Sequence, residues 1–152
     1  MENLYALLYG LLGTALMSFV LYGVQQAGGP SAANVRGIGS SVPTPHGGSL
    51  VPGAAAHIVA GALFGLVYLG LGHAWASLAP GSLLALGIGV GLVRGLAVTG
   101  VLSLLAFDQR PMERIQLAGA GTFVVHALGN VVYGLALAVL FGLSRVDSAL
   151  AF

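Results

Sequence analysis

The chain has 152 residues and a net charge of +1 at pH 7, and only 6% of its residues are charged whereas 57% are hydrophobic. A soluble domain carries about 25% charged residues, so water is not the main solvent of this protein's surface, and we expect a single transmembrane domain over residues 1–152. The basic residues are scattered arginines and the chain has no cysteine or lysine, which excludes a nucleic-acid footprint, disulfides, thiolate metal sites, thiol nucleophiles and Schiff-base chemistry.

Residues 4–24 are the first predicted membrane span. Its only nearby charge is Glu2, so it lacks the positive start of a signal peptide and we expect it to be retained. A polar connection rich in Gly, Ser and Pro follows over residues 25–52. The second predicted span covers residues 54–73 and ends beside Trp75, which is typical of an anchor at the membrane interface.

A short uncharged turn at Pro80 and Gly81 precedes the third predicted span, residues 82–107. The fourth predicted span covers residues 115–143, and residues 144–152 are expected to form a short tail. About 20 apolar residues cross a bilayer as a helix, and an open sheet edge would leave backbone groups unsatisfied in lipid. The sequence therefore predicts an all-α membrane protein with four transmembrane helices in a bundle.

The arginines near the span ends predict the orientation. The first and third connections hold Arg36, Arg110 and Arg114, whereas the opposite side holds only Arg145. Basic residues favour the cytoplasmic side. We therefore expect a multi-pass protein of the bacterial cytoplasmic membrane with both termini outside.

An internal similarity relates the two halves of the chain. Residues 56–66 align with residues 125–135, and residues 10–20 align more weakly with residues 91–101. The first alignment pairs His57 with His126, Gly61 with Asn130 and Gly65 with Gly134. This pattern predicts a duplicated two-helix hairpin whose copies run parallel, although chance similarity between apolar helices would also produce it.

Arg94 lies near the centre of the third predicted span, with twelve span residues before it and thirteen after it. A central arginine costs roughly 2.5–3.5 kcal/mol on insertion scales. No acidic residue lies inside any predicted span, so we expect Arg94 to contact a partner subunit or an anion, or to be satisfied internally by carbonyls and tyrosines. Tyr68, Tyr133 and Asn130 are candidates to line the same interior.

Small residues recur at every fourth position in the predicted spans, which lets helix backbones approach closely in lipid. The predicted helix-packing glycines are Gly61, Gly65, Gly87, Gly91, Gly95 and Gly134. Packing within the bundle is the simpler interpretation. Oligomerisation or docking against a foreign helix is the alternative.

His57 and His126 are the candidate cofactor ligands. Two histidines at one depth are what a b-type haem requires, and one would suffice for a chlorophyll magnesium. Alternatively, each imidazole bonds a backbone carbonyl or a hydroxyl such as that of Ser18 or Thr99 and joins the repeats. His73 beside Trp75 is better explained as an interfacial anchor, and we predict no metal site.

Two short patterns carry a resemblance. The first span contains GLLGTALMS, and a helix with His and small residues at four-residue spacing recurs as the second and the last span. The chain thereby resembles a loose group of small four-helix bacterial integral membrane proteins that has no settled activity. The resemblance implies a fold and a membrane, and it accounts for neither Arg94 nor residues 25–52.

No intramembrane acid is present to act as a general base, so we predict that the protein is not an enzyme. We expect a non-catalytic accessory subunit that stabilises a larger membrane complex, with electron-transfer or photosynthetic complexes as hosts by analogy. Its expected partners are the lipid bilayer, bound lipid, and other membrane subunits or copies of itself. The alternatives are a subunit that binds haem b or chlorophyll through His57 and His126, and a small channel or transporter.

Overall fold

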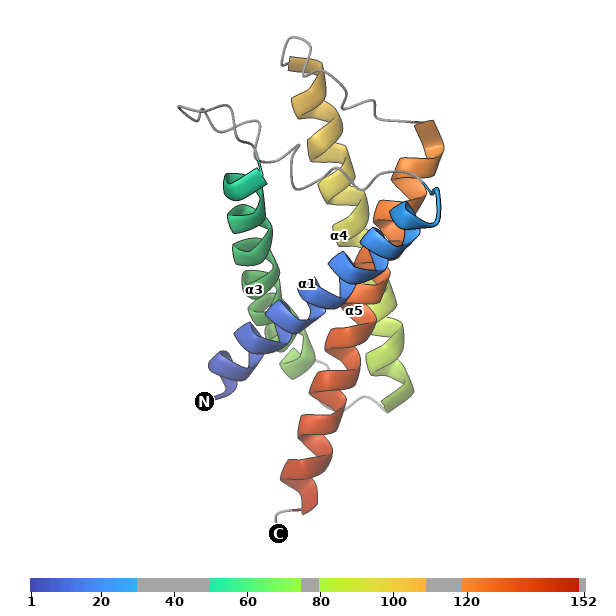
Figure 1. The fold of residues 1–152 in the computed structure, drawn as a ribbon. Coiled ribbons are helices and arrows are strands. Elements are labelled where there is room, and N and C mark those ends of the chain that lie inside the picture. The colour runs from blue at the N-terminus through green and yellow to red at the C-terminus, as the bar shows by residue number, and fades with distance from the viewer. Residues whose placement is uncertain (30–49, 75–79, 109–118, 151–152) are drawn as a thin grey trace.

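The computed structural model describes residues 1–29, 50–74, 80–108 and 119–150 of the chain. These residues form four helices, α1 (Glu2–Gln26), α3 (Leu50–Ala74), α4 (Pro80–Asp108) and α5 (Gly119–Leu150). Each helix is long and apolar enough to cross a membrane. The helices run alternately in opposite directions, so the two termini lie at the same end (Figure 1). The structure confirms the predicted all-α fold with four membrane-spanning helices.

The helices extend beyond several of the predicted span ends. α3 begins at Leu50 and includes Pro52 in its first turn, and α4 begins at Pro80, where a turn was expected. Proline is tolerated in a first helical turn because the N–H that it lacks has no intrahelical partner there. α5 continues to Leu150, so the expected tail is helical over most of its length. The predicted start of the fourth span and its preceding arginines lie outside the described residues.

The glycine Gly28 ends α1. Its backbone φ of +82° is a conformation that favours glycine. The N–H of Gly28 donates to the carbonyl of Gln25 at 3.1 Å, and that of Gly29 donates to Val24 at 2.9 Å. These bonds satisfy carbonyls that the last helical turn would otherwise leave without partners.

The bundle consists of two closely packed helix pairs. α1 packs along α3, α4 packs along α5, and α1 also packs against α5, which joins the pairs. α3 and α4 are not packed closely along their lengths. Side chains bridge them, since the hydroxyl of Tyr68 on α3 donates to the carbonyl of Leu83 on α4 at 3.1 Å.

Glycines permit the close contacts in both pairs. Between α1 and α3, Gly65 lies against Ala6 and Gly10. Between α4 and α5, a Cβ atom added to Gly87 would lie 2.6 Å from the carbonyl oxygen of Gly134. The remaining predicted packing glycines have similar surroundings: Gly61 lies against Thr14, Gly91 against Asn130, Gly95 against Ala127, and Gly134 against Gly87.

Equivalent positions of the predicted repeats make equivalent contacts. Gly134, which aligns with Gly65, lies against Gly87 and near Gly91. These two glycines stand at the positions that align with Ala6 and Gly10, the residues that Gly65 contacts. A duplicated hairpin would produce such a correspondence, and the duplication itself stays a prediction.

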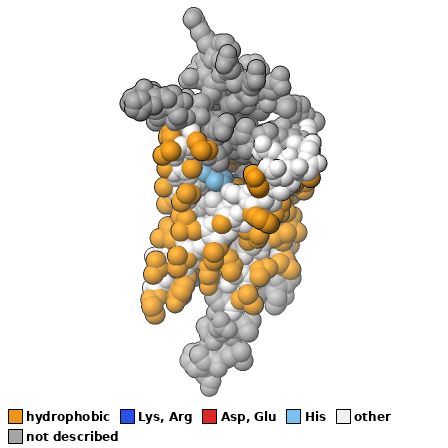
Figure 2. Space-filling view, viewed as in Figure 1, with side chains coloured by type: hydrophobic (Ala, Val, Ile, Leu, Met, Phe, Trp, Pro, Cys, Tyr) orange, Lys and Arg blue, Asp and Glu red, His pale blue; other side chains and the backbone are white. Residues whose placement is uncertain are grey.

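The exterior of the described helices is apolar. Figure 2 shows hydrophobic side chains over one face of the molecule, with a histidine recessed between them. No Asp, Glu, Lys or Arg side chain of the described residues is visible on this face. Large exposed hydrophobic residues include Phe19, Val51 and Val93, with 74%, 77% and 68% of their surfaces exposed. This surface is suited to lipid or to other apolar helices.

Candidate functional site: a buried polar seam

The side chain of Arg94 lies inside the bundle and is only 5% exposed. Its guanidinium carbon is 4.0 Å from the ring centroid of Tyr133 on α5 and 4.6 Å from that of Phe64 on α3. Such cation–π contacts are worth about 0.5–2 kcal/mol each and partly offset the loss of hydration. The arginine therefore fills the space between α3 and α4.

The charge of Arg94 is incompletely compensated. Its Nε and Nη1 atoms are buried and have no hydrogen-bond partner. Among the described residues, the acidic side chain that forms an ion pair is Glu2, whose partner is His73, 3.4 Å away at an exposed end of the bundle. A buried ion carries an effective penalty of several kcal/mol, so an unpaired guanidinium at this depth calls for a partner.

Polar groups on α5 continue from Arg94 toward one end of the bundle. His126, Asn130 and Tyr133 are spaced by four and three residues, so they share one face of the helix. The side-chain amide of Asn130 donates to the carbonyl of His126 at 2.9 Å. Both residues are only 3% exposed, yet Oδ1 of Asn130 and Nε2 of His126 have no partner.

His57 approaches the same region from α3. It is half-buried. Its Nε2 atom lies 3.2 Å from Oγ of Ser18 on α1, the hydroxyl contact that was expected. This bond joins two helices of one predicted repeat and does not join the repeats. We call Ser18, His57, Arg94, His126 and Asn130 the polar seam, in which the last three residues are buried, His57 is half-buried and Ser18 is exposed.

The surroundings of the two candidate ligands differ. Nε2 of His57 already has Ser18 as a partner, whereas Nε2 of His126 has none. Thr99, the hydroxyl considered for His126, donates to the carbonyl of Gly95 in its own helix at 2.8 Å. The described residues also contain no cluster of three or more His, Cys, Asp or Glu side chains suited to a metal ion.

On the side of Arg94 away from His57 and His126, aromatic side chains fill the interior of the bundle. The rings of Tyr9 and Phe141 meet edge to face at 5.1 Å, and those of Tyr68 and Phe141 stack at 5.6 Å. Tyr133 completes this group, which we call the aromatic layer, and its hydroxyl donates to the carbonyl of Gly61 at 2.6 Å. Tyr68 and Tyr133 are 1% and 2% exposed, so the layer leaves little open space.

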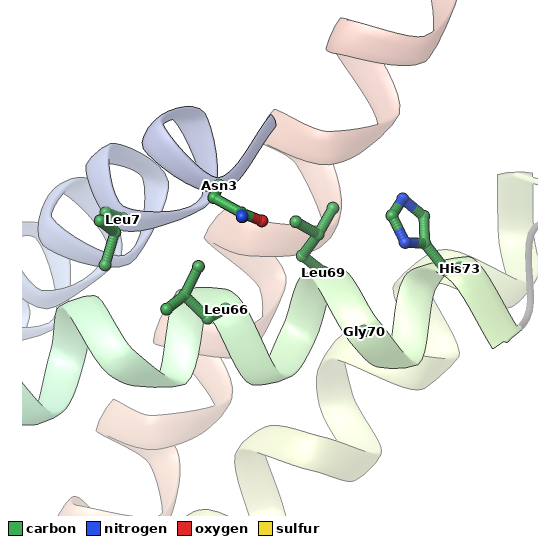
Figure 3. A pocket seen from close by; sticks show the side chains of 6 residues that line it. All are labelled: Asn3, Leu7, Leu66, Leu69, Gly70 and His73. Carbon is green, nitrogen blue, oxygen red and sulfur yellow. The ribbon is translucent and has the colours of Figure 1, made fainter. Parts of the chain in front are cut away.

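A separate pocket lies between the start of α1 and the end of α3, at the end of the bundle away from the polar seam. Its lining residues are Asn3, Leu7, Leu66, Leu69, Gly70 and His73 (Figure 3). His73 stands in the last turn of α3 and is exposed, which suits the interfacial position expected for it. The pocket is open and mostly apolar, so it offers little for specific recognition.

Sequence reasoning missed two residues beside Arg94. Phe64 was not considered, although it follows His57 by seven residues and aligns with Tyr133. Gly13 aligns with Arg94 itself, and a Cβ atom added to it would lie 3.0 Å from the Tyr133 ring. The repeat alignment could have indicated both residues. It pairs Phe64 with Tyr133 and Gly13 with Arg94.

No protein-family model, curated protein or solved structure matches the chain. The chemistry of the polar seam therefore has to be argued from its own residues. It offers one fixed positive charge and hydrogen-bonding atoms without partners, in a low-dielectric interior where such groups interact strongly. Of the residues singled out in the sequence, Arg94 contacts Tyr133, and His57 contacts Ser18.

Proposed function

We propose that the chain is a non-catalytic accessory subunit that stabilises a larger membrane assembly. The observation that carries the proposal is the outward surface of α3. Only 17% of the apolar window of α3 is buried within the chain, compared with 33–39% for the other three helices. A helix so little covered by its own chain has a large surface available to neighbouring subunits.

The exposed face of α3 is suited to helix packing. Ile58, Val59, Leu63 and Val67 are each more than half exposed. Small residues at positions 55, 56 and 70 are exposed on the same helix and allow a second helix to approach its backbone. A partner subunit was one of the partners expected for Arg94, but its side chain is only 5% exposed within the chain, so the proposal does not rest on it. The proposed contact is therefore apolar.

The proposed location is the bacterial cytoplasmic membrane, with both termini on the outer side. The termini share one side because four spans separate them (Figure 1). The choice of side rests on the arginine distribution in the sequence. A host complex of the electron-transfer or photosynthetic kind remains an analogy with other assemblies that recruit small helical subunits.

The native mass of the protein in mild detergent tests the proposal. We expect the chain to migrate with a larger assembly from its own membranes. Val59→Trp on α3 should weaken this association, because the bulky ring disturbs the proposed contact face. Val93→Trp on α4 is the matched control at another exposed valine and should leave the association unchanged. Migration of the wild type as a lone monomer would contradict the proposal.

One observation favours a second candidate, a subunit that binds a chlorophyll or haem. Nε2 of His126 is buried and has no partner, as an axial ligand would require. If this candidate is correct, the purified protein should show a pigment absorption band that His126→Leu abolishes. A colourless protein from native membranes would rule the candidate out.

A further inference from the structure

We infer that the polar seam is a hydrated, one-ended site that holds a small monovalent anion against Arg94. The inference is independent of the accessory-subunit proposal, because it concerns the interior of the bundle and not the outer face of α3. Three observations carry it: the uncompensated charge, the other atoms without partners, and the aromatic layer.

The charge of Arg94 selects the sign and the valence of the ligand. Two aromatic rings lie against the guanidinium, but Nε and Nη1 still lack acceptors. The spans predicted from the sequence, residues 4–24, 54–73, 82–107 and 115–143, contain no acidic residue. A single negative charge at the guanidinium edge would satisfy both the charge and the free donors, since guanidinium forms its strongest hydrogen bonds with anions.

The other unpartnered atoms indicate water beside the anion. Oδ1 of Asn130 is an acceptor and needs a donor, which an anion cannot supply and a water molecule can. Nε2 of His126 lies further along the same helix face and is also unpartnered. Buried water typically makes about three hydrogen bonds to such groups. A water molecule bridging Asn130 to the anion would satisfy groups that the protein leaves unpaired.

The distribution of polar and aromatic groups makes the site one-ended. His57 and His126 each lie about two turns after the start of α3 and α5, and these helices begin at the same end of the bundle (Figure 1). On the other side of Arg94, Tyr68 and Tyr133 are almost completely buried, and their hydroxyls bond backbone carbonyls. The anion therefore enters from the end that holds the histidines and does not cross the bundle.

Burial also limits the size of the ligand. Arg94 is 5% exposed and lies against two aromatic rings, so a lipid headgroup attached to its acyl chains cannot reach it from the bilayer. Chloride and formate are small enough to serve as probes, and gluconate is a larger anion suited to the reference buffer.

Anion titration of the purified full-length protein in detergent tests the inference. Chloride or formate replaces gluconate at constant ionic strength, and the unfolding temperature is recorded for wild type, Arg94→Leu and Arg36→Leu. Arg36→Leu is the matched control, since it makes the same change in the predicted polar connection. We expect a saturable rise in the unfolding temperature for wild type and Arg36→Leu, and none for Arg94→Leu. Equal shifts in all three proteins would show a general salt effect and overturn the inference.

Two measurements on the wild type alone keep the inference testable if Arg94→Leu does not fold. The chloride NMR line should broaden in the presence of the protein, and formate should reverse the broadening by competition. No saturable broadening would overturn the anion site. Vesicles containing the protein should lose chloride no faster than protein-free vesicles, because the aromatic layer closes one end. A fast leak would overturn the one-ended geometry.

Discussion

The hydroxyl of Tyr133 on α5 donates a 2.6 Å hydrogen bond to the backbone carbonyl of Gly61 on α3, 72 residues earlier in the chain. The same tyrosine stacks on Arg94 of α4 and packs against Gly13 of α1. One side chain thus connects its own helix to the other three. The contact is also where the polar seam meets the aromatic layer.

Tyr133→Phe should destabilise the bundle while keeping the ring that covers Arg94. Interhelical hydrogen bonds in membrane proteins contribute about 0.6 kcal/mol on average and up to about 1.7 kcal/mol. We expect a loss near the upper value, because the bond is short and buried. Reversible unfolding in mixed micelles measures the loss. Tyr22→Phe is the control, since Tyr22 is 61% exposed, and an equal loss in both variants would contradict the prediction.

Gly87→Ala should destabilise the bundle, whereas Gly89→Ala should not. A Cβ atom at Gly87 would lie 2.6 Å from the carbonyl oxygen of Gly134, whereas one at Gly89 would meet no atom within 4 Å. Overpacking typically costs about 1–3 kcal/mol. Alanine is favoured over glycine in an open helical position by roughly 0.5–1 kcal/mol. We expect a lower unfolding temperature for Gly87→Ala and an unchanged or higher one for Gly89→Ala. A lower unfolding temperature for both variants would contradict the prediction that only Gly87 is at a close helix contact.

Glu2→Gln should have little effect on stability. Glu2 and His73 form an ion pair of 3.4 Å, but their side chains are 76% and 58% exposed. Exposed ion pairs contribute about 0–1 kcal/mol and are screened by salt. We expect the unfolding free energy to change by less than about 1 kcal/mol, with a smaller change at high salt. A larger loss would mean that the pair fixes the ends of α1 and α3.

Single cysteines should report both termini on one side of the membrane. The chain has no native cysteine, so Glu2→Cys, Ser148→Cys and His46→Cys each introduce a unique thiol. A membrane-impermeant maleimide added to intact cells should label the first two and not the third, if the termini are outside. Labelling of His46→Cys alone would reverse the proposed orientation, and labelling of only one terminus would contradict the four-span topology.

The fold was largely predictable because lipid leaves few alternatives. Four apolar stretches of sufficient length can only cross a bilayer as helices, and the structure has a helix at each of them. The helix ends were less predictable. Pro52 was placed in the polar connection and Pro80 in a turn, although both lie in first helical turns, where proline is compatible with a helix.

The environment of Arg94 was only partly predictable. Its position indicated that it needed a partner, and Tyr133 was named among the side chains that could line the interior. Whether the guanidinium faces inward or outward depends on how α4 rotates about its axis. The glycine contacts of Gly87 and Gly91 with α5 set that rotation, and they turn Arg94 toward Phe64. Sequence spacing alone does not define which helix meets the glycine face.

The arrangement of the helices in two pairs has a mechanical consequence. Glycine contacts fix α1 on α3 and α4 on α5, whereas the two pairs meet mainly along α1 and α5. Such a bundle should deform most easily by opening like a book, with the α1–α5 line as the spine and α3 and α4 as the free edges. Tension or thinning of the bilayer would then act first on the Tyr68–Leu83 bond and the Arg94–Phe64 stack, which hold those edges together.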